Sequence, residues 1–104
     1  MRLEDNPIIA AVRTGRELEG ALASEVPLIF LLSGSILTLK DTLQRIHAEK
    51  KQAFVHIDLA EGIGKDNAGI AFLAELGADG IISTRAGLIR AAKDCGLETV
   101  QRFF

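Results

Sequence analysis

The sequence has 104 residues, 48% of them hydrophobic and 25% charged, which is typical of one small globular domain spanning residues 1–104. Its formal net charge of −2 lacks the basic excess of most nucleic-acid-binding proteins, so any contact with RNA needs a local patch. One cysteine excludes an internal disulfide, and no apolar run is long enough to span a bilayer. With no signal-peptide pattern, these features predict a cytoplasmic protein.

The first two predicted strands are the apolar runs 7–12 and 26–32, and a helix is predicted between them. Thr14 followed by Glu17 is the pattern of a capping box at the start of this helix. The apolar positions on one face of the helix are Leu18, Ala21 and Leu22.

A second helix follows, and its apolar positions are Leu39, Leu43 and Ile46. The third strand is predicted at 53–57. Asp66 then caps a third helix that is closed by Gly77, because aspartate favours helix starts and glycine favours helix ends.

The fourth strand is predicted at 80–83, followed by a helix with Thr84 as its cap and Gly96 as its stop. The fifth strand is predicted at 98–104. Strands that alternate with helices in this way predict an α/β fold with a parallel sheet and right-handed crossovers. The ending inside a fifth strand favours the N-terminal part of a longer barrel, and its open edges favour self-association into a homo-oligomer.

Polar side chains gather where the predicted strands end, and ligands of parallel α/β folds bind at that edge. Alternation puts Phe54, His56 and Asp58 on one face of the third strand, toward a cleft or barrel interior. The opposite face, which should pack on helices, consists of Val55, Ile57 and Leu59. His56 and Asp58 are therefore candidate site residues, although a buried histidine often only satisfies a carbonyl and a terminal aspartate often caps a loop.

The fourth and fifth strands offer further candidates. Ser83 and Thr84 either cap the next helix or, with its free N–H groups, form an anion site to which Arg85 adds charge. Arg102 follows a strand interior, where an arginine needs a carboxylate or a phosphate as its partner, and Asp58 and Glu61 are candidates. The sequence contains no glycine-rich nucleotide motif, no metal-ligand spacing and no nucleophile elbow, so neither a metal nor a cofactor is predicted.

Several stretches together resemble the glycerol-3-phosphate-responsive antiterminator family over nearly the whole chain. They include "FVHIDLAEGIGKDNAGIAFL" and "DGIISTRAGLIRAAKDCGLETVQRFF". The resemblance implies a (β/α)8 barrel of the TIM type. It also implies a cytoplasmic regulator that binds glycerol-3-phosphate and then a leader mRNA, and so prevents transcription termination in glycerol-utilisation operons.

The resemblance also implies a ligand site in three segments of the chain. The first is a rim after the third strand formed by Asp58, Glu61, Lys65 and Asp66. The second is Ser83, Thr84 and Arg85, where the family often has lysine in place of Arg85, and the third is Gln101 and Arg102. Family members continue past the position of Phe104, and the last loops of TIM barrels usually bind phosphate, so this chain is expected to lack that part of the site.

Two other functions fit parts of the pattern. A TIM-barrel-like enzyme acting on a small phosphorylated polyol would use His56 and Asp58 as its acid–base pair. A phospho-receiver-like domain would need an acidic pair after the first strand, where this sequence has "AAVRTGRE". RNA contacts would lie on basic positions such as Lys40, Arg45, Lys50 and Lys51, which serve equally well as a solvated helix face.

Overall fold

The computed structural model describes residues 8–103. Pro7 and Phe104, predicted as the ends of the first and last strands, lie outside the described residues. The strands are β1 (Ile9–Val12), β2 (Leu28–Leu31), β3 (Gln52–His56), β4 (Gly80–Ser83) and β5 (Glu98–Gln101). The helices are α1 (Gly15–Ala23), α2 (Leu39–Ala48), α3 (Asn67–Leu76) and α4 (Ala86–Asp94), with one 3-10 turn, η1 (Ile57–Leu59).

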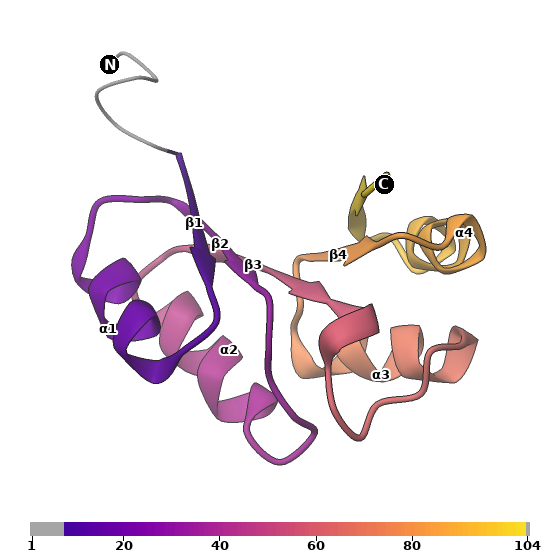
Figure 1. The fold of residues 1–104 in the computed structure, drawn as a ribbon, viewed down its shortest axis with the longest axis horizontal. Coiled ribbons are helices and arrows are strands. Elements are labelled where there is room, and N and C mark those ends of the chain that lie inside the picture. The colour runs from indigo at the N-terminus through magenta and orange to yellow at the C-terminus, as the bar shows by residue number, and fades with distance from the viewer. Residues whose placement is uncertain (1–7, 104) are drawn as a thin grey trace.

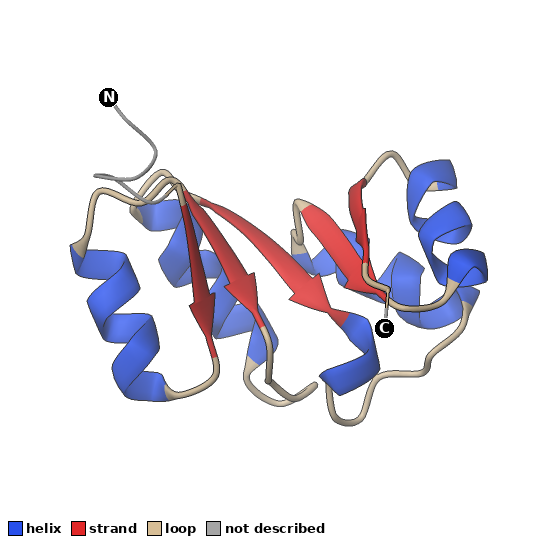
Figure 2. Ribbon diagram, turned by 45° about the horizontal axis from the view of Figure 1, so that its top comes forward, coloured by secondary structure: helices blue, strands red, loops and turns tan. Residues whose placement is uncertain are grey.

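The strands form one parallel sheet in the order β1-β2-β3-β4-β5, so each strand pairs with the next one along the chain. The strand arrows in Figure 2 run in the same direction, and the helices lie on the outer side of the curved sheet in Figure 1. This is an α/β fold with a partial, barrel-like sheet, which confirms the predicted fold class. Within residues 8–103, no helix is long and apolar enough to cross a membrane.

Local sequence signals set most of the helix boundaries. Thr14 and Glu17 form the predicted capping box at α1, where the Thr14 hydroxyl accepts from the Glu17 N–H. Asp66 caps α3 by accepting from the Gly69 N–H, and Gly77 ends α3 in the left-handed conformation with φ +106°. The predicted cap of α4 is wrong, because Arg85 occupies the N-cap position without a side-chain hydrogen bond and Thr84 binds Asp58 instead.

The two faces of the sheet have different partners. Alternate strand residues, among them Ile29, Val55 and Ile81, are fully buried against the helices in one core cluster. Leu59, predicted on this side, is instead 48% exposed, because the chain leaves the strand after His56 and enters η1, where strand alternation no longer applies.

The concave face of the sheet is also largely apolar. The rings of Phe30 and Phe54 stack there with centroids 5.5 Å apart. Gly80 lies beside Phe54 in the β3–β4 register, and a Cβ at Gly80 would approach the ring to 2.7 Å. A glycine is therefore needed at this position for the Phe54 ring to fit over β4.

Lys51, at the start of β3, is only 8% exposed. Its ammonium group donates hydrogen bonds to the carbonyls of Ser24 at 2.6 Å and Val26 at 2.7 Å. A positive charge is thereby placed after the C-terminal end of α1, a helix that has no basic residue in its own last turn. The interpretation of Lys51 as part of a surface patch for RNA is thus wrong, and Arg45 in the same set pairs with Glu19.

Candidate ligand-binding site

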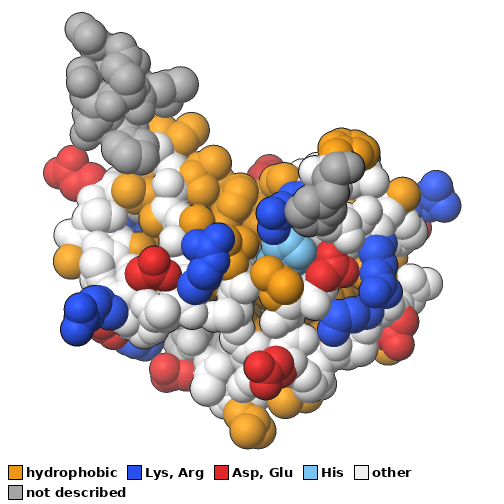
Figure 3. Space-filling view, viewed as in Figure 1, with side chains coloured by type: hydrophobic (Ala, Val, Ile, Leu, Met, Phe, Trp, Pro, Cys, Tyr) orange, Lys and Arg blue, Asp and Glu red, His pale blue; other side chains and the backbone are white. Residues whose placement is uncertain are grey.

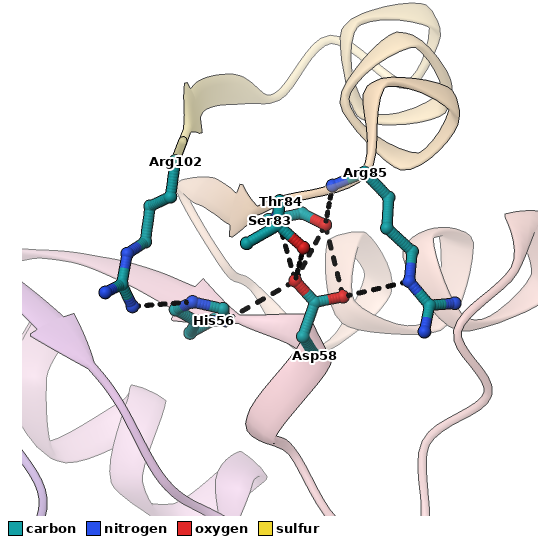
Figure 4. A network of polar contacts seen from close by, with 6 residues as sticks. All are labelled: His56, Asp58, Ser83, Thr84, Arg85 and Arg102. Carbon is teal, nitrogen blue, oxygen red and sulfur yellow. Dashed lines mark hydrogen bonds and ion pairs between the residues drawn. The ribbon is translucent and has the colours of Figure 1, made fainter. Parts of the chain in front are cut away.

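Asp58 is the centre of a polar network at the carboxyl ends of β3 and β4 (Figure 4). Its Oδ2 accepts from the Thr84 N–H at 2.9 Å and from the Ser83 hydroxyl at 3.0 Å. The guanidinium of Arg85 lies 3.7 Å from Oδ1 and forms an ion pair with it. The Asp58 side chain is 15% exposed, so one edge of the carboxylate reaches solvent.

The local fold explains how these groups meet. His56 pairs with Ile82 in the parallel register, so the residues after β3 lie beside the end of β4. The η1 turn then carries Asp58 toward Ser83. The Ser83 hydroxyl also accepts from the Arg85 N–H at 3.0 Å, which fixes the start of α4 against the same carboxylate. Asp58 therefore joins the end of β3 to the loop that follows β4.

The network keeps Asp58 ionised. Burial of the carboxyl alone would raise its pKa, but the hydrogen bonds from the Thr84 N–H and the Ser83 hydroxyl stabilise the charged form. The charge of Arg85, and that of His56 when the ring is protonated, act in the same direction, and the pKa of Asp58 is lowered as a result. The site thus holds a fixed negative charge with acceptor oxygens at its edge.

His56 is buried, with 3% of its surface exposed, and its two ring nitrogens face different neighbours. Nε2 lies 3.0 Å from Nη1 of Arg102. Because arginine can only donate, Nε2 must accept, and the proton of the neutral ring is therefore on Nδ1. Among the described residues, Nδ1 has no hydrogen-bond partner, and it lies 3.9 Å from Oδ2 of Asp58.

The surroundings of His56 favour the neutral ring. Burial lowers the pKa of His56 most strongly, the Asp58 carboxylate raises it, and the positive charge of Arg102 lowers it again. The net effect is a pKa below the ordinary value of 6.5. Nδ1–H is therefore a buried donor that faces the Asp58 carboxylate, and such a donor is costly to leave unpaired.

The structure brings together six of the eight predicted site residues, and these are His56, Asp58, Ser83, Thr84, Arg85 and Arg102. Neither Asp58 nor Glu61, the two predicted candidates, pairs with Arg102, which contacts the imidazole of His56, and Arg85 is the arginine beside Asp58. The turn η1 accounts for both pairings, because it directs the Asp58 side chain toward β4 and away from β5.

Glu61 and Lys65 lie on the exposed loop between η1 and α3. The backbone of Glu61 forms a parallel bridge with Ser35, which ties this loop to the one after β2. Across residues 8–103, no hydrogen bond or ion pair joins either side chain to the Asp58 network. These two residues can approach a ligand only from the rim.

One further residue, Arg13, is among the polar residues that follow the predicted strands, but it is not among the predicted site residues. Arg13 directly follows β1, and it lines a cavity together with Arg102 at the other edge of the sheet. Its position after a strand is a signal that the sequence does contain, but nothing near it in the sequence marks a partner. No cluster of three or more histidine, cysteine or acidic side chains among residues 8–103 could hold a metal ion.

Comparison with known proteins places this arrangement in a family. The family described as "Glycerol-3-phosphate responsive antiterminator" matches residues 8–104. The chain belongs to this family. The antiterminator family match covers β1 through β5, and so includes every residue of the network described above.

Relatives of known structure have the same fold. The glycerol uptake operon antiterminator regulatory protein of Listeria monocytogenes str. 4b F2365 is 32% identical with a TM-score of 0.88, covering 95% of this chain and 55% of that one. A glycerol uptake operon antiterminator-related protein of Thermotoga maritima MSB8 is 33% identical with a TM-score of 0.83, covering 92% and 54%.

A curated relative is the uncharacterized protein YgcP of Escherichia coli (strain K12). It is 40% identical over 103 residues, which make up 98% of this chain and 54% of that protein. The chain therefore spans about half the length of the relatives that it matches.

Proposed function

We propose that this chain senses glycerol-3-phosphate for an RNA-binding antiterminator that regulates glycerol-utilisation genes. The protein would act in the cytoplasm as a regulator and not as an enzyme. The observation that carries the proposal is a polar network at the ends of the neighbouring strands β3, β4 and β5, in a chain of the antiterminator family. Its members are His56, Asp58, Ser83 and Arg102. Strand ends are where parallel α/β folds bind ligands.

The geometry around His56 suits a hydroxyl of a small polyol. A hydroxyl both donates and accepts, so it can accept from Nδ1–H of His56 and donate to Oδ2 of Asp58. The two atoms are 3.9 Å apart, too far for a good hydrogen bond with each other. Glu61 and Lys65 would complete the rim of the site, with Ser83, Thr84 and Arg85 holding the Asp58 carboxylate in place.

We further propose that residues 1–104 form a single domain equivalent to the N-terminal part of a (β/α)8 barrel. The sequential parallel order of β1–β5, with helices on the outer side, supports this proposal. Leader mRNA is the proposed macromolecular partner. Its binding should weaken steeply as salt increases, because phosphate contacts release counterions, and a filter-binding series at rising salt measures this.

Thermal unfolding with and without glycerol-3-phosphate tests the sensor proposal. A ligand that binds only the folded state raises the unfolding midpoint. We expect the ligand to raise the unfolding midpoint of the wild-type chain and to raise that of Asp58→Asn by less. The control is Glu75→Gln, at an exposed position of α3, and its midpoint should rise as much as that of the wild type. An equal rise for Asp58→Asn and wild type would contradict the assignment of the site, and turnover of the ligand would show an enzyme instead.

A further inference from the structure

The cavity lined by Arg13 and Arg102 lies on the concave side of the sheet, at the same end as Asp58. Its volume is about 230 Å³. The residues that line it are Arg13, Phe30, Leu32, Ile82, Val100 and Arg102. This is below the roughly 300–1,000 Å³ of pockets for drug-sized ligands, so the cavity can hold only a small molecule or part of one.

The polar side chains that line this cavity are both cationic. Four of its six lining residues are apolar, and the other two are arginines. In residues 8–103, no carboxylate forms an ion pair with the Arg13 side chain. An anion in this cavity would be attracted by both guanidinium groups.

Hydrogen bonds fix the backbone of Arg13 and the guanidinium group of Arg102. The Arg13 carbonyl accepts from the Ser33 hydroxyl at 2.6 Å, and its N–H donates to the Glu17 carboxylate at 2.7 Å. The Arg102 guanidinium donates to the buried ring of His56. A guanidinium carries five N–H donors, so one group can bind a histidine and an anion together.

The cavity also adjoins the proposed hydroxyl site, since Arg102 belongs to both. Figure 3 shows this face hollowed, with Lys and Arg side chains bordering exposed hydrophobic atoms and a histidine. A single small molecule could therefore place an anionic group between the arginines and its hydroxyl groups near His56 and Asp58.

We propose that Arg13 and Arg102 bind the phosphate group of a small phosphate monoester in this cavity. The ligand class rests on the proposed sensor function, whereas the anion site rests on the two arginines and the cavity alone. The proposal differs from the expectation that this chain lacks a phosphate site. Arg13 follows the edge strand β1 and Arg102 follows the edge strand β5, and both exposed side chains line the rim of the same cavity.

Titration calorimetry on the whole chain tests the proposal with glycerol-3-phosphate, glycerol and inorganic phosphate as probes. The test variant is Arg13→Gln, and the matched control is Arg16→Gln, which removes an exposed arginine three positions away on α1. We expect Arg13→Gln to weaken binding of glycerol-3-phosphate and inorganic phosphate about tenfold or more, since charged hydrogen bonds to phosphate are strong. Glycerol binding and the unliganded unfolding midpoint should be unchanged, and Arg16→Gln should match wild type.

The outcomes separate this site from the sensor function. Arg13-dependent binding of inorganic phosphate without binding of glycerol-3-phosphate supports the anion site and contradicts the sensor. Equal binding of glycerol-3-phosphate by wild type and Arg13→Gln overturns the anion site and leaves the sensor standing. Absence of phosphate binding by the wild-type chain overturns the site, as does an Arg13→Gln defect seen only with RNA.

Discussion

Arg102 donates a hydrogen bond from Nη1 to Nε2 of His56 over 3.0 Å, although the two residues are 46 positions apart in the sequence. This contact assigns the proton of the neutral imidazole to Nδ1, the atom that faces Asp58. The tautomer of a buried histidine at the end of β3 is thus set by an arginine after β5.

Removing the Arg102 charge should change the titration of His56. Burial is the main cause of the lowered pKa of His56, and the Arg102 charge lowers it further. We therefore expect Arg102→Met to raise the pKa of His56 and to mix the two tautomers, as measured by NMR titration of the ring nitrogens. Arg90→Met, on the exposed side of α4, is the control. An unchanged pKa in Arg102→Met would show that the contact does not act on the ring.

Folding stability should fall in two separate steps as the pH decreases. The pKa of His56 is lower in the folded chain than its ordinary 6.5, so below about 6.5 the unfolded chain binds a proton that the folded chain does not. Stability is lost from that pH downward until the folded pKa is reached. For Asp58 the lowered pKa gives stability that is present above 3.8 and lost as the pH falls below it.

Urea unfolding at a series of pH values measures both steps. His56→Gln should remove the decline that begins near pH 6.5 and leave the more acidic decline in place. A decline of the same slope in His56→Gln would mean that another group causes it.

Neutralising Asp58 should destabilise the fold even without ligand. The amide oxygen of an asparagine would accept from the Thr84 N–H and the Ser83 hydroxyl more weakly than the carboxylate does, and the uncharged amide would lose the ion pair with Arg85. We expect Asp58→Asn to lower the free energy of unfolding by about 1–3 kcal/mol, the usual cost of disrupting buried hydrogen bonds to a charged group. Chemical denaturation measures it, with Glu75→Gln expected to stay within about 0.5 kcal/mol of wild type.

Lys51 offers a second stability test, at the opposite end of the sheet. Lys51→Met keeps much of the buried aliphatic chain but removes the donor to the Ser24 and Val26 carbonyls. The expected loss is about 1–3 kcal/mol in the free energy of unfolding. Lys50→Met is the matched control, since Lys50 is the exposed neighbour of Lys51. Equal stabilities of the two variants would contradict a structural role for the buried ammonium group.

Two helical glycines should respond in opposite directions to alanine. A Cβ at Gly69 in α3 would lie 1.8 Å from the Gly64 carbonyl oxygen, so Gly69→Ala should displace the loop before α3 and cost about 3 kcal/mol or more. A Cβ at Gly20 in α1 would have no neighbour within 4 Å, so Gly20→Ala should raise the free energy of unfolding by about 0.5–1 kcal/mol. Thermal unfolding of the pair checks both signs.

Local patterns in the sequence were sufficient to predict the alternation of strands and helices. The capping box at Thr14 and the glycine stop at Gly77 each involve residues a few positions apart, and the structure confirms both. The same holds for the helix faces formed by Leu18 and Leu43, which are buried as predicted. Signals of this kind need no knowledge of the tertiary structure.

The contacts of the site could not be predicted in this way. Threonine is a residue type that often caps helices, but in this fold Asp58 approaches from η1 and accepts from the Thr84 N–H. The choice between Arg85 and Arg102 as the partner of Asp58 depends on where a 3-10 turn directs one side chain, and strand alternation does not encode it. Arg13 joins the site only because sheet curvature brings β1 and β5 around one cavity.

The unbroken strand order has a consequence for biosynthesis. Each strand pairs with the one made immediately before it, across a single helix. A nascent chain can thus add every new βα unit to a sheet that already exists, and no strand has to wait for a distant partner. His56 and Arg102 are the exception, because their contact forms only after β5 has joined, so the site is completed last.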